Sequence, residues 1–230
     1  MATYVLVHGS YQGGWIWKDV ANRLREAGHA VYAPSLDGCG ERKDQVRAGI
    51  TTETQADEIA RLLFYEDLSD VVLVGTSSGG MVVCRVAELM RDRIERLVFV
   101  DALALFSGEK IRDIVQRSTA TAGGLTAGPS REDAANRLFA DLEPKIKAWA
   151  LERYTQHPIG IYEQPVELDS FWSQSWPDSH VIWCKRAQNP GEAHQRRTAD
   201  KLGATWDELD TGHYPMLSMP GELTALLLRP

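Results

Sequence analysis

The sequence predicts an α/β fold, in which a mostly parallel, doubly wound sheet carries helices on both faces and one helical cap insertion. Short β-branched runs alternate with segments whose apolar residues recur at helical spacing, which is typical of such a sheet. The run at residues 71–74 is apolar without a break, which indicates a strand buried on both faces. Between about Ala102 and Ser179 the strand signal disappears, and it resumes afterwards.

The N-terminal part of the chain begins with an apolar run at residues 4–7, which predicts a buried strand. A helix is expected over residues 15–27. Gly28 ends it, because glycine is the usual residue for a left-handed helix terminus. A second strand is expected at residues 30–33, where Pro34 stops it.

The pattern then repeats twice. Residues 54–65 have the apolar spacing of an amphipathic helix, and the strand at residues 71–74 follows them. Valine, alanine and methionine recur at helical spacing over residues 82–90, which predicts the next helix. Residues 96–100 have the composition of another strand.

Two further strands, at residues 181–184 and 204–209, and a helix at residues 220–228 close the chain. The stretch of roughly 105–179 between the two groups of strands is helical, polar and rich in aromatic residues. It contains a loose Thr, Ala and Gly segment at residues 118–129. We therefore expect one domain of 230 residues, with this stretch inserted as a cap.

Composition narrows the class of protein. A formal charge of −7 disfavours nucleic acid and anionic membrane surfaces as partners. No run approaches the roughly 20 apolar residues of a membrane helix, and the chain starts without a leader pattern. The three distant cysteines, Cys39, Cys84 and Cys184, resemble neither a disulfide framework nor a zinc site. We expect a cytoplasmic enzyme without metal or cofactor, and a homodimer is left open.

The candidate nucleophile lies between the strand at residues 71–74 and the helix that follows. Residues 75–79, Gly-Thr-Ser-Ser-Gly, match the pattern G-x-S-x-G. The pattern alone is a weak signal, but a strand, a tight turn and a helix are the context that a nucleophile elbow needs. Ser77 is therefore the predicted nucleophile, and an ordinary glycine-rich turn is the alternative.

A serine hydroxyl needs a base to take its proton. His213 lies in a Gly-containing loop after the last predicted strand, where the base of a Ser, acid, His order belongs. The other five histidines fit that place less well. His213 is the predicted general base, and a loop histidine without a catalytic role is the alternative.

An oxyanion hole needs two backbone N–H groups that point at the developing negative charge. One is expected from Ser78, which follows the nucleophile. The other is expected from Ser10 in the loop after the first strand, which Gly13 and Gly14 keep thin. A plain strand-to-helix turn is the alternative.

Together these segments resemble the branch of the α/β-hydrolases that holds plant methylesterases, hydroxynitrile lyases and small bacterial esterases. The resemblance rests on VLVHGSYQGGW at residues 5–15, GTSSGGM at 75–81 and GHYPM at 212–216. It covers the chain outside the cap, and it implies cofactor-free hydrolysis of small esters through an acyl-enzyme.

Two positions separate this chain from the lyases of that branch. In the lyases, a threonine follows the first-loop histidine and a lysine follows the catalytic histidine. Gly9 and Tyr214 stand at these positions here. No side chain would then hold a cyanide leaving group, so an esterase is favoured over a lyase.

The acid of the triad departs from the family pattern. The family's aspartate normally follows the strand at residues 181–184, but here Ala187 stands in its place. Asp101, at the end of the preceding strand, is the best replacement, and an aspartate that caps a turn is the alternative. The other candidates are the carboxylates Glu167, Asp169 and Asp210.

The expected substrate is a small ester or carbamate with an aromatic group, such as the benzimidazole carbamates cleaved by some bacterial relatives. Gly9 and the cap residues Trp149, Phe171, Trp172 and Trp176 are candidates for the substrate pocket. The four aromatic residues either line that pocket or hold the cap on the sheet. A lyase and a non-catalytic small-molecule binding protein remain the rival functions.

Overall fold

The computed structural model describes residues 1–115, 124–176 and 178–229. Six strands form one sheet in the order β2-β1-β3-β4-β7-β8, and each neighbouring pair is parallel. The parallel sheet that the sequence predicts is confirmed. Its strands are β1 (Thr3–Val7), β2 (Ala30–Tyr32), β3 (Val71–Ser77), β4 (Ile94–Ala102), β7 (Ser179–Cys184) and β8 (Thr205–Leu209).

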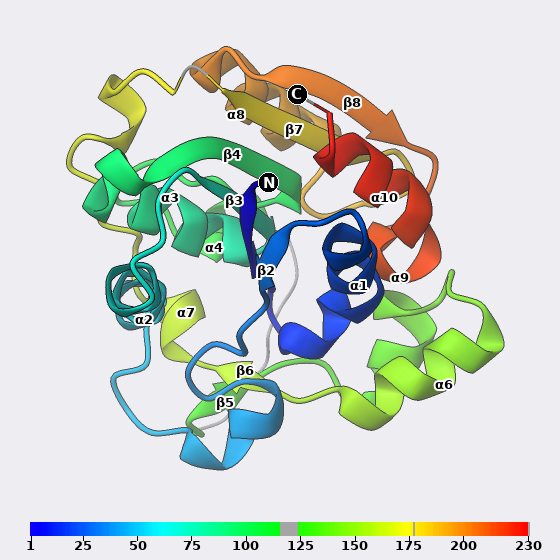
Figure 1. Ribbon diagram of the computed structural model, residues 1–230. Helices are drawn as coiled ribbons and strands as arrows, with labels where there is room; N and C mark the ends of the chain where they lie inside the picture. Colours follow the sequence, from blue (N-terminus) through cyan, green and yellow to red (C-terminus); the bar gives the residue numbers. More distant parts are fainter. Residues whose placement is uncertain (116–123, 177, 230) are drawn as a thin grey trace.

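Helices cover both faces of this sheet (Figure 1). One face packs against α2, α3 and α8, and the other against α1, α9 and α10. These helices are α1 (Lys18–Glu26), α2 (Thr52–Tyr65), α3 (Gly79–Leu89), α8 (Glu192–Leu202), α9 (Pro215–Ser218) and α10 (Pro220–Leu227). Short 3-10 turns precede or follow some of them: η1 (Gly14–Trp17), η2 (Gly40–Gln45) and η3 (Arg91–Arg93).

The central strands β1 and β3 are mainly apolar because both of their faces are buried. Successive side chains of a strand point to opposite faces. In β1, Val5 and Val7 belong to the core under α2 and α3, whereas Tyr4 and Leu6 belong to the core under α1 and α10. All four are at most 3% exposed. The unbroken apolar runs of the sequence thus reflect a sheet covered on both sides.

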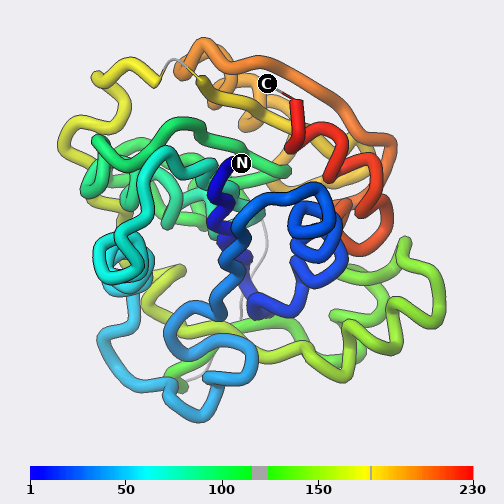
Figure 2. The backbone as a smooth tube through the Cα atoms, in the orientation of Figure 1, coloured from blue at the N-terminus to red at the C-terminus, as the bar shows by residue number. Residues whose placement is uncertain are grey.

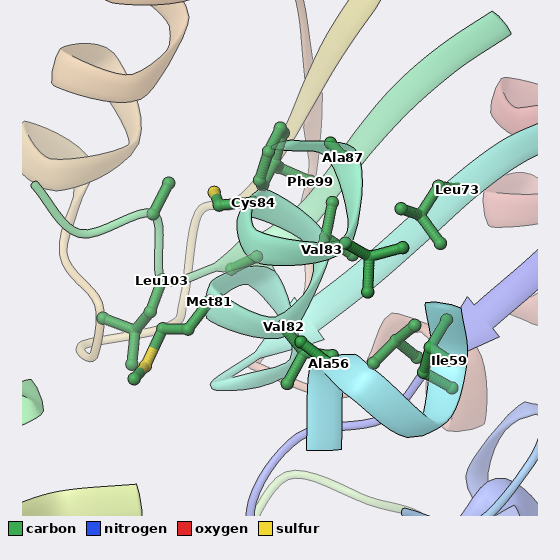
Figure 3. Packing of buried hydrophobic residues seen from close by; sticks show 14 of the residues in the cluster. Ala56, Ile59, Leu73, Met81, Val82, Val83, Cys84, Ala87, Phe99 and Leu103 are labelled. Carbon is green, nitrogen blue, oxygen red and sulfur yellow. The ribbon is translucent and has the colours of Figure 1, made fainter. Parts of the chain in front are cut away.

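Helix α3 fixes the strand-to-helix connection at the centre of the sheet. Figure 3 shows this helix beside Leu73 of β3 and Phe99 of β4, with its Val82 next to Ala56 of α2. Leu73 and Phe99 are fully buried, and burying side chains of this size contributes about 1.5–3 kcal/mol each. The turn between β3 and α3 is therefore held from both sides by the core.

The segment between β4 and β7 runs across the end of the sheet at which β1 ends (Figure 2). It contacts the loop after β1, where the Thr155 amide donates to the Tyr11 carbonyl at 3.3 Å. Its helical elements are α4 (Ile111–Ile114), α5 (Arg131–Asp133), η4 (Ala134–Leu138), α6 (Pro144–Arg153), α7 (Gly160–Glu163) and η5 (Phe171–Ser173).

This segment differs from the prediction in one respect. It contains a two-residue antiparallel ladder between β5 (Thr126–Ala127) and β6 (His157–Pro158). A ladder this short leaves no alternating pattern in the sequence. Most of the loose segment expected at residues 118–129 lies outside the described residues.

The observed ends of several helices and strands differ by a few residues from the ends predicted from the sequence. The expected helix at residues 15–27 is divided into η1 and α1, and Gly28 ends it with a φ of 87°. Helix α2 begins two residues earlier than expected, because Thr51 caps it in a reciprocal pair with Thr54. Strands β3 and β4 continue to Ser77 and Ala102, the point at which the candidate site begins.

Candidate active site

Ser77 lies at the sharp turn between β3 and α3. Its φ of 52° is unusual for a residue with a side chain, and this is the strained geometry of a nucleophile elbow. The flanking glycines are required by contacts. A Cβ atom on Gly75 would lie 2.9 Å from the Gly79 carbonyl oxygen, and one on Gly79 would lie 2.5 Å from that of His8. Strand and helix can approach this closely only with glycine at both positions.

Asp101 occupies the equivalent place on the neighbouring strand β4, with a φ of 45°. Its carboxylate is fully buried, and Oδ2 lies 2.5 Å from Nδ1 of His213. Oδ1 accepts the Cys184 amide at 3.4 Å. Burial raises the pKa of Asp101, and its interaction with His213 acts in the opposite direction. The structure thus brings a carboxylate against the predicted base.

His213 lies in the loop between β8 and α9, with 18% of its side chain exposed. The residue before it, Gly212, donates its amide to Asp141 Oδ2 at 2.9 Å. A Cβ atom on Gly212 would lie 2.1 Å from the same oxygen, so only glycine allows this contact. Asp141, from the segment between β4 and β7, therefore holds the loop that carries His213.

The loop after β1 is fixed by a buried histidine. His8 Nε2 accepts the Leu36 amide at 2.9 Å, so Nδ1 carries the proton and donates to the Gly9 carbonyl at 2.8 Å. Burial lowers the pKa of His8 to about 4, which keeps the ring neutral. The side-chain hydroxyls of Ser10 and Ser78 are 2.9 Å apart. The two predicted oxyanion-hole residues therefore lie side by side.

A cavity of about 590 Å³ joins these elements. Ser77 and His213 both line it, together with Ser10 and Ser78. The other lining residues come from the loop after β1, the segment between β4 and β7, and the loops that follow β4, β7 and β8: Tyr11, Leu103, Ile111, Arg112, Val115, Gly128, Pro129, Ser130, Asp133, Arg137, Leu138, Tyr162, Asn189, Pro190 and Tyr214.

None of the five pocket residues predicted from the sequence is among the residues that line this cavity. Phe171 and Trp176 are buried against each other, with ring centroids 5.2 Å apart. Trp172 Nε1 donates to the Leu105 carbonyl at 2.9 Å. Trp149 packs edge-on against Trp15 at 5.3 Å. These four aromatic side chains hold the segment between β4 and β7 on the rest of the fold.

Gly9 lies directly against Ser77. A Cβ atom at this position would lie 2.4 Å from Ser77 Cβ and 3.0 Å from Ser77 Oγ. The missing side chain thus gives room to the serine and is no part of the cavity wall. A threonine here, as in the lyases, would collide with Ser77.

The aromatic wall of the cavity is formed by tyrosines instead. Tyr11, Tyr162 and Tyr214 line it, and the rings of Tyr11 and Tyr162 are stacked with centroids 6.3 Å apart. Sequence reasoning missed Tyr11 and Tyr162. Tyr11 stands next to Ser10 in the segment at residues 5–15 that carries the family resemblance, and that position is the signal that could have found it.

The other candidate acids differ from Asp101 because their side chains are exposed. Glu167 and Asp169 are exposed on the segment between β4 and β7. Asp210 is 78% exposed and lies 3.5 Å from Arg186. Of the predicted carboxylates, Asp101 is the one in contact with His213, at 2.5 Å from Nδ1.

Across the residues that the structure describes, no group of three His, Cys, Asp or Glu side chains is arranged to hold a metal ion. No helix in that part of the chain is long and apolar enough to cross a membrane. Cys39, Cys84 and Cys184 are buried and form no disulfide.

A serine at a strand-to-helix elbow, beside a His–Asp pair at the carboxyl end of a parallel sheet, is the arrangement of an α/β-hydrolase. The chain belongs to the alpha/beta hydrolase family, whose model matches residues 4–226. The predicted resemblance is therefore confirmed.

Relatives with esterase names cover almost the full chain. It is 29% identical to a carbendazim hydrolyzing esterase from Nocardioides sp., over 99% of this chain and 98% of that protein. It is 36% identical to Methylesterase 2 of Arabidopsis thaliana, over 98% of this chain and 94% of that protein. The crystal structure of an Arabidopsis methylesterase superposes with a TM-score of 0.82, at 19% identity, over 100% of this chain and 98% of that one. The last comparison shows the fold.

Proposed function

We propose that this chain is a serine hydrolase that cleaves small esters or carbamates through an acyl-enzyme. Ser77 is the nucleophile, His213 the general base and Asp101 the acid that orients the base. The observation that carries the proposal is the 2.5 Å contact between Asp101 Oδ2 and His213 Nδ1, beside a cavity that Ser77 also lines.

The proposed mechanism follows from the proton on His213. Asp101 holds the tautomer in which Nδ1 carries the proton, so Nε2 can accept the proton of Ser77 Oγ. Oγ then forms a bond to the carbonyl carbon, and the amides of Ser10 and Ser78 stabilise the oxyanion. Nε2–H protonates the leaving alcohol or amine as its bond to the carbonyl carbon breaks. Water, deprotonated by His213, then releases the acyl group from Ser77.

The ester class is supported by relatives named esterase, lipase and methylesterase. Carbamate cleavage is supported by the relative whose name includes carbendazim hydrolysis. An aromatic group on the substrate is supported by Tyr11, Tyr162 and Tyr214, which line the cavity. Screening methyl salicylate, naphthyl acetate and methyl benzimidazolylcarbamate tests this choice, and inactivity on all three would exclude an aromatic substrate.

The two rival functions have less support. The lyases' threonine has no room at Gly9, where a Cβ atom would lie 2.4 Å from Ser77 Cβ. Cyanide release from mandelonitrile would revive that function. The binding-protein alternative relied on the missing acid at Ala187, and the buried carboxylate of Asp101 beside His213 removes that reason.

The central test is Ser77→Ala, with turnover of 4-nitrophenyl acetate as the readout. We expect turnover to fall to the background rate, with the circular dichroism spectrum unchanged. The matched control is Ser175→Ala, at an exposed serine outside the cavity, which should keep full activity. Turnover retained in Ser77→Ala would remove the nucleophile from the proposal.

A further inference from the structure

The wall of the cavity carries two arginines. Arg112 lies in α4 and Arg137 in η4, so both come from the segment between β4 and β7. Their side chains are exposed, and they line the same cavity as Ser77 and His213. Both arginines therefore border the space that a substrate of Ser77 would occupy.

Neither guanidinium is neutralised by a residue that the structure describes. Within residues 1–115, 124–176 and 178–229, no hydrogen bond or ion pair joins Arg112 or Arg137 to another residue. Some other arginines of this chain are paired with carboxylates: Arg85, for example, lies 2.6 Å from Glu53 and 2.7 Å from Glu88. The cavity arginines are therefore available to bind a ligand.

The charge balance of the lining is positive. Among the described lining residues, those that carry a charge apart from the proposed base are Arg112, Arg137 and Asp133. Asp133 is partly engaged, because its Oδ2 accepts the Ser130 hydroxyl at 2.9 Å. Two cations thus face one carboxylate, although the whole chain has a formal charge of −7. A local positive potential on an acidic protein attracts anions to that place.

We propose that the substrate of this site is an ester that also carries a carboxylate, which Arg112 and Arg137 bind. Guanidinium groups pair with carboxylates through two parallel N–H···O bonds, a geometry that lysine cannot match. The inference rests on the proposed function of the same site. It narrows the substrate from small aromatic esters to anionic ones.

Matched substrates test the inference. Monomethyl terephthalate and methyl 4-carbamoylbenzoate differ in one group, which is a carboxylate in the first and a neutral amide in the second. 4-Acetoxybenzoate and 4-acetoxybenzamide repeat the comparison with the charge on the leaving group. In at least one pair, wild-type kcat/KM should favour the anionic ester, and 0.5 M NaCl should reduce that preference.

Variants of Arg112 and Arg137 test whether these two residues cause the preference for the anionic ester. Arg112→Gln and Arg137→Gln should each lower the ratio of anionic to neutral kcat/KM by about fivefold, mainly through KM for the anionic ester. The double variant should lower it further. Arg131→Gln is the matched control, because this exposed arginine of α5 lies outside the lining and its removal changes the charge equally. It should keep the wild-type ratio.

Equal kcat/KM for both members of both pairs in the wild type would overturn the inference, and so would a preference that survives in the double variant. Turnover of 4-nitrophenyl acetate separates these results from a failure of the proposed function. If the wild type hydrolyses no ester, its binding of benzoate and of benzamide is measured by calorimetric titration. Benzoate should bind more tightly than benzamide, and equal binding would overturn the inference.

Discussion

Replacing Asp101 with asparagine removes one charge and leaves the shape of the site. The fully buried carboxylate uses Oδ2 for His213 Nδ1 and Oδ1 for the Cys184 amide. If the asparagine oxygen keeps the Cys184 amide, its NH₂ group faces Nδ1 and forces the proton of the ring onto Nε2. If the side chain turns over, its NH₂ group faces the Cys184 amide, and two donors meet. The first orientation selects the tautomer that cannot accept the proton of Ser77, and the second keeps the active tautomer only at the cost of the clash between two donors.

The loss of activity that results from removing the charge of Asp101 can be estimated. At about 4 Å between charge centres and an effective dielectric constant of about 20, the carboxylate stabilises the imidazolium by about 4 kcal/mol. Removing that energy lowers the rate by about 10³-fold, and the wrong tautomer extends the loss to about 10⁴-fold. We therefore expect kcat/KM of Asp101→Asn to fall by about 10³- to 10⁴-fold.

The assay is hydrolysis of 4-nitrophenyl acetate between pH 6 and 9, with Asp169→Asn as control. Asp169 is an exposed carboxylate outside the cavity, so its variant should keep wild-type activity. A loss below tenfold in Asp101→Asn would refute the role given to Asp101.

The contribution of Asp101 to folding stability should depend on pH. Burial raises the pKa of Asp101, so the folded protein favours the protonated carboxyl. The contribution of this group to stability is therefore present below its ordinary pKa of about 4 and lost as pH rises through its raised value. Relative to Asp101→Asn, the wild type should gain free energy of unfolding as pH falls toward about 4, measured by urea unfolding. A relative loss would contradict the direction of the shift.

Three further predictions follow from the loops around the site. Gly9→Ala places a Cβ atom 2.4 Å from Ser77 Cβ, and the resulting displacement of the serine should lower kcat/KM by about 10²-fold. Unchanged activity would show that the loop after β1 moves to accommodate the methyl group. Asp141→Ala removes the acceptor of the amide before the base, a loss of about 1 kcal/mol, so kcat/KM should fall about fivefold, and an unaltered value would deny that contact a role. Burial lowers the pKa of His8 to about 4 and of His157 to about 3, so their contribution to stability is full above about pH 6.5 and is lost as pH falls; each should cost about 2 kcal/mol between pH 7 and 5, and urea midpoints that do not shift would contradict this.

The sequence predicted the sheet and the positions of the candidate catalytic residues because both depend on local patterns. The central strands contain short apolar runs next to turn signals. Ser77 is marked by glycines that its own turn requires, and His213 by its place after the last strand. The loop residues Ser10 and Ser78 follow from the same two turns. Their roles in catalysis stay predictions.

Asp101 was less certain because its partner is distant in sequence. The end of β4 approaches the loop of His213 only through the order of strands in the sheet, in which β4 lies between β3 and β7. A strand-end aspartate has the same local pattern whether it caps a turn or touches a histidine 112 residues away.

The predicted pocket residues differ from the lining of the cavity because composition does not tell which way a side chain points. Trp149 and Trp176 share the apolar character expected of a pocket wall, yet they pack on Trp15 and Phe171. The cavity lining from the same segment includes exposed residues such as Arg112, which have no local signature in the sequence.

Labelling with a fluorophosphonate, followed by peptide mass mapping, tests the activated serine most directly. The reagent forms a stable bond only with a serine oxygen whose proton is being removed. Wild-type protein should gain one adduct, located on Ser77, and the rate of labelling should drop sharply in His213→Ala. A protein that stays unlabelled, or an adduct on another serine, would contradict the account.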